Sequence, residues 1–288
     1  MSKVNTEERF AVHPDAYERF TMAELRKHFL VADLFQPDSL NLTYTHYDRF
    51  VLGGAMPVSG PLELVAPNQF KAAHFLARRE LGIINVGGAG RVIVNGESIA
   101  LDYKEALYIG CGDHTVVFES AFAAEPAKFY LNSTPAHQAF PVRKVSRADA
   151  DIVQMGSLET SNARAINKLL VNSVLPTCQL QMGMTELQPG SVWNTMPCHT
   201  HSRRMEAYFY FEVPEDQAIC HFMGPADQTR HLWLANEQAA VSPPWSIHSG
   251  AGTSNYVFIW GMAGENLDYG DMDHITPTML ASGGCTHE

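Results

Sequence analysis

The sequence lacks the features that mark membrane, secreted and nucleic-acid-binding proteins. It has no apolar run near the roughly 20 residues that cross a bilayer. The first ten residues contain no apolar core of a secretory signal. Positive charge is scarce, because 20 Lys and Arg stand against 31 Asp and Glu, a formal net charge of −11. We therefore expect neither a membrane protein nor a nucleic-acid partner.

Cysteine is also sparse and shows no pairing pattern. The five cysteines contain no Cys-x-x-Cys pair and are scattered along the chain, at Cys111, Cys178, Cys198, Cys220 and Cys285. An odd, scattered set is typical of free thiols in a reducing compartment, which predicts a cytoplasmic protein. The sequence has neither a Gly-rich phosphate loop nor a Ser/His/Asp signature.

Turn residues and short alternating runs fill much of the chain. Asn95-Gly96 separates two alternating runs within residues 91–102. This pattern predicts a β-hairpin, because a type I′ turn needs positive φ at both central positions. Short helices are predicted in pieces of residues 1–35, where Thr21-Met-Ala-Glu24 has the form of a capping box, and over residues 162–170.

Short strands with frequent turns lie on both sides of a polar, proline-containing connection at residues 133–148. Such a pattern favours closed or sandwiched β architecture. We predict an all-β protein with a domain junction in that connection, so that the domains are 1–148 and 149–288.

A group of candidate metal ligands lies in the second half. His199 and His201 are two residues apart, so on a strand both imidazoles face the same side. Four residues separate His201 from Glu206, enough for a tight turn, and His248 follows a Pro-Pro-Trp-Ser-Ile approach to a later strand. Three imidazoles and a carboxylate suit zinc, iron, manganese or nickel. Cys198 would point the other way, and we interpret it as a packing residue.

The first half has no His-x-His pair. His74, Glu80 and His114 stand at only remotely comparable places. We interpret this half as a metal-free copy of the second and the two histidines as structural.

These motifs resemble the paired motifs of the cupin superfamily. Gly190, His199-x-His201-x4-Glu206 and Pro243-x4-His248 follow its order, although Gly190 lies farther from His199 than in the common pattern and Trp245 stands where glycine is frequent. Longer stretches resemble one family, the bacterial 5-keto-4-deoxyuronate isomerases, or 4-deoxy-L-threo-5-hexosulose-uronate ketol-isomerases. These stretches are residues 47–57, 167–174, 179–187, 194–197, 203–211, 260–266 and 271–274.

The resemblance implies a fold of two cupin-type β-barrels with one Zn²⁺ per subunit in the C-terminal barrel. It places the zinc ligands on His199, His201, Glu206 and His248. It also implies a homohexamer and a small-molecule uronate substrate. The implied reaction converts 4-deoxy-L-threo-5-hexosulose uronate to 3-deoxy-D-glycero-2,5-hexodiulosonate in the degradation of pectin or other uronate polymers.

Moving a carbonyl to the neighbouring carbon requires a general base, which the sequence leaves unidentified. If Glu206 points inward, Tyr208 and Tyr210 share its face by the period of a strand. The candidates for catalysis are Gln181, Tyr210 and Tyr256. For the substrate carboxylate, which a guanidinium binds well, the candidates are Arg203, Arg204, Arg164 and Lys168.

Two other functions fit the same ligands. An iron or manganese dioxygenase or oxidase uses similar donor sets. A non-enzymatic, sugar-binding cupin is the third reading, because this fold serves many activities.

Overall fold

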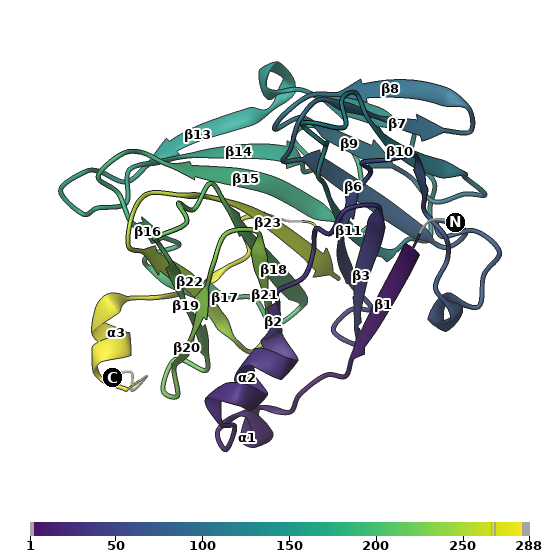
Figure 1. Cartoon of the computed structure of the whole chain (residues 1–288). Helices are drawn as coiled ribbons and strands as arrows, with labels where there is room; N and C mark the ends of the chain where they lie inside the picture. Colours follow the sequence, from purple (N-terminus) through teal and green to yellow (C-terminus); the bar gives the residue numbers. More distant parts are fainter. Residues whose placement is uncertain (1–2, 266, 268, 284–288) are drawn as a thin grey trace. The chain divides into compact units, whose positions relative to one another are not determined.

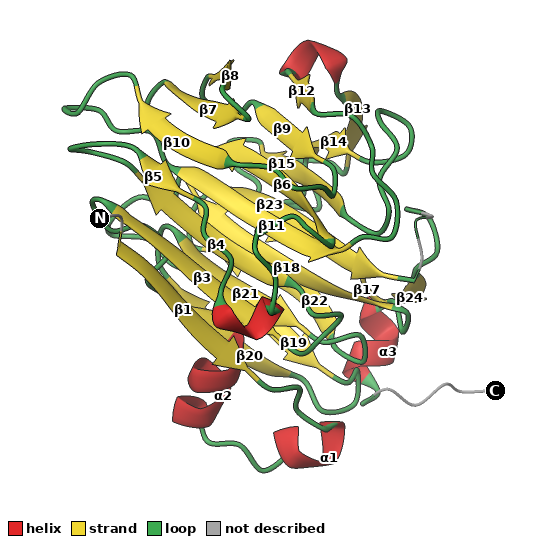
Figure 2. Ribbon diagram, turned by 90° about the vertical axis from the view of Figure 1, so that its right-hand side faces the viewer, coloured by secondary structure: helices red, strands yellow, loops and turns green. Residues whose placement is uncertain are grey.

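The computed structural model describes residues 3–265, 267 and 269–283, and β-strands make up most of its regular structure (Figures 1 and 2). Cys285 and residue 266, the last of the stretch 260–266, lie outside the described residues. Three short α-helices occur in the described part: α1 (Pro14–Tyr17), α2 (Met22–Phe29) and α3 (Pro277–Ala281). None of these helices is long and apolar enough to cross a membrane. The prediction of an all-β protein is confirmed.

The chain divides into two compact units. The described residues of the N-terminal unit fall within Met1–Arg9, Asp33–Asp151 and Lys168–Met182. Those of the C-terminal unit fall within Phe10–Ala32, Ile152–Asn167 and Gly183–Glu288. The change at Asp151 lies close to the predicted junction at residue 148. The two units also exchange segments: Phe10–Ala32 belongs to the C-terminal unit and Lys168–Met182 to the N-terminal unit. A single boundary in the sequence therefore does not describe the division.

The N-terminal unit contains a seven-stranded sheet in the order β1-β3-β4-β11-β6-β9-β12 and a four-stranded sheet in the order β5-β10-β7-β8. Their bounds are β1 (Lys3–Arg9), β3 (Ser39–Thr45), β4 (Val51–Met56), β5 (Leu62–Glu63), β6 (Arg79–Asn85), β7 (Gly90–Val94), β8 (Glu97–Leu101), β9 (Ala106–Ile109), β10 (Val116–Ser120), β11 (Phe129–Pro135) and β12 (Arg143–Val145). Two 3₁₀ turns, η1 (Asn68–Phe70) and η2 (Arg147–Asp149), lie between strands.

A second seven-stranded sheet has the order β13-β14-β15-β23-β18-β21-β2, and a second four-stranded sheet the order β16-β22-β19-β20. The boundaries between the two units fall within β13, β14 and β15. Strands β17 and β24 form a separate two-stranded sheet. Their bounds are β2 (Leu30–Val31), β13 (Asp151–Met155), β14 (Arg164–Leu170), β15 (Gln181–Leu187), β16 (Trp193–Asn194), β17 (Cys198–Thr200), β18 (Arg204–Phe211), β19 (Ile219–Gly224), β20 (Arg230–Leu234), β21 (Gln238–Ser242), β22 (Ile247–Gly252), β23 (Val257–Gly264) and β24 (Asp273–Ile275).

Local sequence signals explain several elements. Asn95 and Gly96 have φ of 52° and 85° and join β7 to β8, as the hairpin pattern predicts. The side chain of Thr21 accepts from the backbone N–H of Glu24, and the Glu24 side chain caps Thr21 in return, so the capping box that begins α2 is confirmed.

The prediction of short helices in pieces of residues 1–35 is confirmed by α1 and α2, whereas the helix predicted over residues 162–170 is wrong. Residues 164–170 form β14, a strand between β13 and β15, and not part of a helix. Residues 3–9 form β1, which pairs in parallel with β3 along its whole length. In both segments, ladder pairing with neighbouring strands outweighs the local helical preference.

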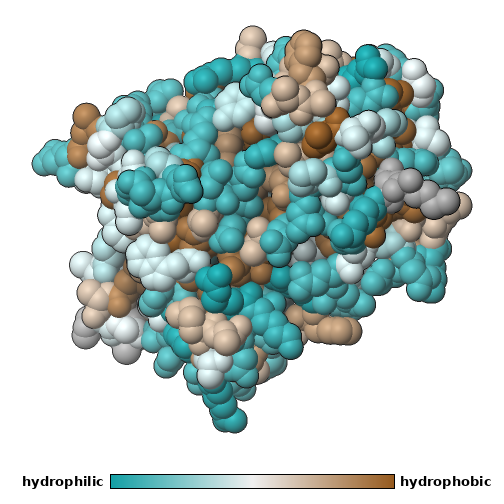
Figure 3. Space-filling view, in the orientation of Figure 1, coloured by the Kyte–Doolittle hydropathy of each residue, from teal (hydrophilic) through white to brown (hydrophobic). Residues whose placement is uncertain are grey.

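An apolar core fills the N-terminal unit. Its buried side chains come from both sheets and include Leu81, Ile83, Val92, Val116 and Phe118. Alternate residues of β6 and β10 thus point inward, as period-two patterning requires. On the face of the molecule drawn in Figure 3, brown apolar residues are interspersed with teal polar ones.

Candidate metal centre

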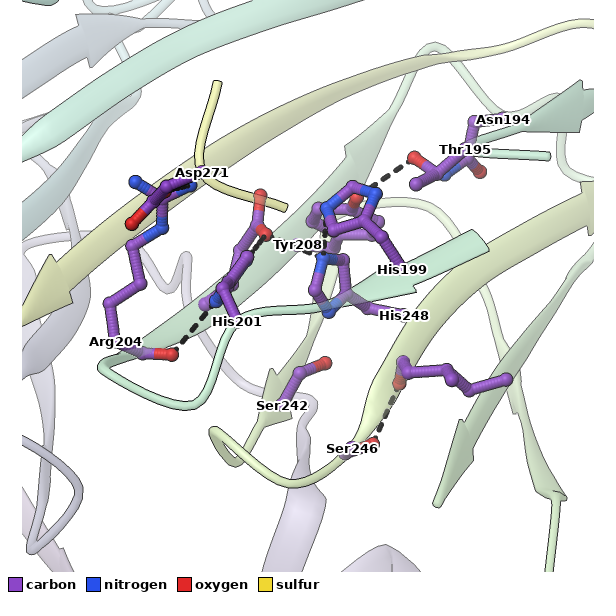
Figure 4. A network of polar contacts seen from close by, with 12 residues as sticks. Asn194, Thr195, His199, His201, Arg204, Tyr208, Ser242, Ser246, His248 and Asp271 are labelled. Carbon is purple, nitrogen blue, oxygen red and sulfur yellow. Dashed lines mark hydrogen bonds and ion pairs between the residues drawn. The ribbon is translucent and has the colours of Figure 1, made fainter. Parts of the chain in front are cut away.

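Four predicted ligands meet inside the C-terminal unit. His199 lies on β17, His201 directly follows that strand, Glu206 is the third residue of β18, and His248 is the second residue of β22. All four are buried, with exposed fractions of 7, 3, 4 and 1%. One ligand atom from each lies within 4.8 Å of the others. Figure 4 shows the three imidazoles pointing toward one another.

Short contacts connect these four side chains. Glu206 Oε2 lies 3.0 Å from His201 Nε2 and 2.8 Å from His248 Nε2. His248 Nε2 lies 2.9 Å from His199 Nε2. Pairing of β17 with β24, in which His199 is opposite His274, holds the first ligand in place.

The donor set fits a cation. His201 Nδ1 lies 2.9 Å from the carbonyl oxygen of Arg204. A carbonyl only accepts, so Nδ1 carries the proton and Nε2 presents a lone pair. That lone pair faces Glu206 Oε2, itself an acceptor when ionised. A metal ion among these atoms would satisfy both, and the Arg204 carbonyl orients the imidazole as outer-shell partners of metal ligands do.

Burial and mutual proximity shift the acid–base properties of the cluster. Burial lowers the pKa of His199 to about 2, with a further contribution from His248. Burial also lowers the pKa of His248. Burial raises the pKa of Glu206, but His248 and His201 lower it more, so the net pKa lies below its ordinary value. Neutral imidazoles and an ionised carboxylate are the protonation states that bind metal.

Tyrosines surround the cluster. The Tyr208 ring centroid is 5.4 Å from that of His248, and the Tyr208 hydroxyl is 2.8 Å from Thr195 Oγ1. Tyr210 packs beside Tyr208 and Tyr256, which confirms that the inward face of β18 carries both tyrosines. Burial raises the pKa of Tyr208, Tyr210 and Tyr256 well above the ordinary value. These phenols are therefore hydrogen-bond donors at neutral pH.

Two polar residues of this region were missed by the sequence analysis. His221 is fully buried on β19, and its Nδ1 lies 2.8 Å from the Tyr210 hydroxyl. Burial lowers its pKa to about 3. Asn194 accepts a hydrogen bond from the Tyr256 hydroxyl through Oδ1. The alternation of Ile219, His221 and Met223 on one strand could have identified the inward histidine.

The candidate cations differ in their surroundings. Arg203 is exposed and pairs with Glu265 at 2.6 Å, Arg204 is fully buried and pairs with Asp271 at 2.8 Å, and Lys168 pairs with Asp151 at 3.0 Å. Arg164 is buried, donates to the carbonyl of Asn162 at 2.8 Å, and is given no ion pair by the described residues. Burial lowers its pKa, whereas Tyr208, Tyr269 and Tyr256, within electrostatic range, raise it.

Two further residues of the sequence analysis have buried positions. Gln181, the first residue of β15, is 1% exposed, and neither atom of its amide has a hydrogen-bond partner in the described chain. Cys198 packs with Ile247 and Ile275, which agrees with a packing role, and burial raises its pKa to about 11. The four described cysteines are free.

The fold and the buried His₃Glu cluster define a cupin-type protein with a candidate metal centre. Residues 30–276 match the KduI/IolB family, and the chain belongs to it. It is 61% identical to the 4-deoxy-L-threo-5-hexosulose-uronate ketol-isomerase 1 of Bacteroides thetaiotaomicron, over 94% of this chain and 97% of that protein. It is 57% identical to the ketol-isomerase of the same name from Formosa agariphila, over 93 and 95%.

A solved structure supports the fold. The crystal structure of an IolB-like protein from Salmonella typhimurium LT2 superposes with a TM-score of 0.63 at 15% identity, covering 82% of this chain and 89% of that one. The predicted resemblance to the ketol-isomerase family is confirmed by the curated relatives. The prediction of an enzyme, an intramolecular oxidoreductase of the ketol-isomerase type, is confirmed with it.

Proposed function

We propose that the protein converts the aldehyde 4-deoxy-L-threo-5-hexosulose uronate to the ketone 3-deoxy-D-glycero-2,5-hexodiulosonate, with one zinc ion per chain. The observation that carries this proposal is the buried cluster of three histidines and Glu206, whose ligand atoms lie within 4.8 Å of one another. Relatives named for that substrate at 57–61% identity support the choice of reaction.

His199, His201, Glu206 and His248 would hold the ion, and three nitrogens with one carboxylate oxygen suit zinc. Bound there, zinc supplies Lewis-acid polarisation of the substrate carbonyl and of the adjacent hydroxyl. The same donors suit iron or manganese, so an oxygen-dependent activity is the second candidate.

We infer that Arg164 binds the substrate carboxylate. It is the one predicted cation candidate to which the described residues give no acidic partner, and it is buried in the unit that holds the cluster. Tyr208 and Tyr256, two of the tyrosines around the cluster, lie within electrostatic range of its guanidinium, which supports this role. A planar guanidinium binds a carboxylate through two parallel hydrogen bonds.

The reaction removes a proton from one carbon and returns it to its neighbour. Tyr210 and His221 form a buried hydrogen-bonded pair at 2.8 Å, and the imidazole is neutral because burial lowers its pKa to about 3. We infer that this pair relays the transferred proton: the Tyr210 oxygen would accept it as the phenol proton passes to His221 Nδ1, and the reverse transfer would return a proton to the neighbouring carbon. Tyr208, as a protonated phenol, would donate a hydrogen bond to a substrate oxygen while accepting one from Thr195 Oγ1. Tyr256 donates to Asn194 Oδ1.

A homohexamer and a role in pectin or uronate-polymer degradation remain proposals that rest on the family resemblance. A cytoplasmic location is proposed with them, supported by the four free thiols. Sedimentation velocity of the purified protein tests the assembly, because a hexamer of 31.9 kDa chains separates clearly from a dimer or trimer.

The activity is tested by incubating purified protein with freshly lyase-generated substrate and following both compounds by NMR. We expect conversion that a chelator abolishes and zinc restores, without oxygen uptake. Conversion unaffected by complete metal removal would overturn the metal-dependent reaction. Oxygen consumption coupled to substrate loss would establish the second candidate, and binding without turnover by metal-loaded protein would establish a sugar-binding cupin.

A further inference from the structure

A second candidate binding site lies in the N-terminal unit. A pocket of about 280 Å³ opens beside the start of β6 and the end of β11, where Arg79 pairs with Pro135. Three arginines line it, Arg49, Arg78 and Arg79, together with the aromatic side chains of Tyr44, Phe70 and Phe75. No acidic residue is among its described lining, although the whole chain has a formal net charge of −11.

Arg79 is the buried floor of this pocket. It is only 6% exposed, yet its partners are all neutral oxygens: Ser133 Oγ at 3.1 Å, the Ser133 carbonyl at 2.9 Å and the Arg49 carbonyl at 2.6 Å. The Phe70 ring centroid lies 4.6 Å from its guanidinium carbon. The described residues give it no ion pair, and burial lowers its pKa to about 9. Buried charges are ordinarily paired.

The other two arginines are exposed. Arg78 Nη2 donates to the carbonyls of Phe70 and Lys71 at 2.7 and 3.2 Å, which holds its guanidinium beside the aromatic wall. One acidic residue, Glu8, hydrogen-bonds the lining residue Gln69. Glu8 pairs with His46 at 2.8 Å, and the described residues show no ion pair between Glu8 and the three arginines.

We propose that this pocket binds a small carboxylate with a sugar-sized body, such as a hexuronate. Guanidinium groups match the planar geometry of a carboxylate, and the three rings supply a surface on which a pyranose ring can pack. The volume of about 280 Å³ lies just below the usual range of small-molecule sites, roughly 300–1,000 Å³. This site is separate from the His₃Glu cluster and does not depend on the proposed isomerase activity.

The test is isothermal titration of the metal-loaded full chain with D-galacturonate, D-galactose and inorganic phosphate. The Arg49→Gln/Arg78→Gln double variant removes two charges from exposed positions, so it should fold. Arg91→Gln, an exposed arginine of the same unit that pairs with Glu119, is the matched control. Arg164→Gln removes the guanidinium proposed to bind a carboxylate in the C-terminal unit.

We expect galacturonate to bind Arg91→Gln and Arg164→Gln with at least one site of wild-type affinity. In the double variant that site should weaken by about tenfold or more, as expected for lost hydrogen bonds to charged groups. Galactose should not bind there. No galacturonate binding at millimolar concentration, or unchanged binding in the double variant, would overturn the site. Phosphate binding more tightly than galacturonate would overturn its assignment to carboxylates.

Discussion

The N-terminal and C-terminal units share one strand order and differ in what lies inside. The core order β3-β4-β11-β6-β9 with β5-β10-β7-β8 has its counterpart in β14-β15-β23-β18-β21 with β16-β22-β19-β20. Each strand of the first order corresponds to the strand at the same place in the second order, and corresponding strands follow one another along the chain in the same sequence. The similarity of the two halves was weak in the sequence because it lies in pairing and not in residue identity.

The interiors differ along strands that hold matching places in this order. The third residue of β18 is the ligand Glu206, whereas the third residue of β6 is the core residue Leu81. His248 is paired with Met223 in one unit, and Val116 with Val94 in the other. Among the described residues, matching strands thus carry metal-binding side chains in the C-terminal unit and apolar core residues in the N-terminal unit. Function follows from the residues at the site and not from the fold.

Both units also bury a glutamate, with opposite consequences. Glu80 accepts from the backbone N–H groups of Cys178, Gln179 and Leu180 at 2.8, 2.7 and 2.7 Å, and from the Tyr108 hydroxyl at 2.7 Å. Four donors satisfy its carboxylate within the N-terminal unit. Glu206 instead faces the lone pair of His201 Nε2, so its carboxylate needs a cation. We infer that Glu80 is structural and Glu206 functional.

The largest expected effect comes from removing a ligand. His248→Ala should lower bound metal and reduce isomerase activity to the background of the assay, because a three-ligand site holds the ion far more weakly. Elemental analysis and NMR turnover measure the two quantities. His74→Ala, which replaces one of the two histidines named in the first half, should keep wild-type metal content and wild-type activity. Full activity in a metal-free His248→Ala protein would contradict the assignment.

Replacing the N-terminal glutamate should affect stability and not metal content. Glu80→Ala leaves three buried N–H groups without their acceptor, a cost of about 3 kcal/mol or more. Thermal denaturation should show a Tm lower by roughly 6–12 °C for a unit of this size. Glu97→Ala, an exposed carboxylate of the same unit, is the control. Loss of metal with an unchanged Tm would show that the two glutamates have been assigned the wrong way round.

The substrate carboxylate offers a narrower comparison within the C-terminal unit. Arg164→Ala should lower kcat/KM by roughly 10- to 150-fold, the range for losing a hydrogen bond to a charged group of about 1.5–3 kcal/mol. Steady-state kinetics measure this change, with metal content as a check on folding. Arg203→Ala, which removes an exposed guanidinium, should change kcat/KM little. A larger loss in Arg203→Ala than in Arg164→Ala would reverse the assignment.

The smallest expected effect is a difference in pH dependence. His221 has its pKa lowered by burial from 6.5 to about 3. Between these values the unfolded chain binds a proton that the native chain does not, so stability falls as pH falls. The decline should reach up to about 1.4 kcal/mol per pH unit from this group. The free energy of unfolding, measured by chemical denaturation, should fall less steeply with falling pH in metal-free His221→Gln than in metal-free wild type. Parallel slopes would mean that His221 protonates equally in the native and unfolded chains.

Much of this organisation could be predicted from the sequence. The His199-x-His201 spacing, the turn to Glu206 and the distant His248 are brought together as predicted, because strand periodicity fixes which side each residue faces. The Asn95-Gly96 turn was predictable because a type I′ turn needs positive φ, which these two residue types adopt readily. By contrast, β14 and β1 depend on pairing with distant strands. That no described acidic residue pairs with Arg164 depends on which groups reach it in three dimensions.

The most direct test is to titrate metal-free protein with zinc while measuring bound metal and isomerase activity in the same samples. We predict that activity rises with bound zinc and reaches its plateau at one ion per chain, and that His248→Ala shows neither. Activity in the metal-free protein, or a plateau reached without occupancy of the site that His248→Ala removes, would contradict the account.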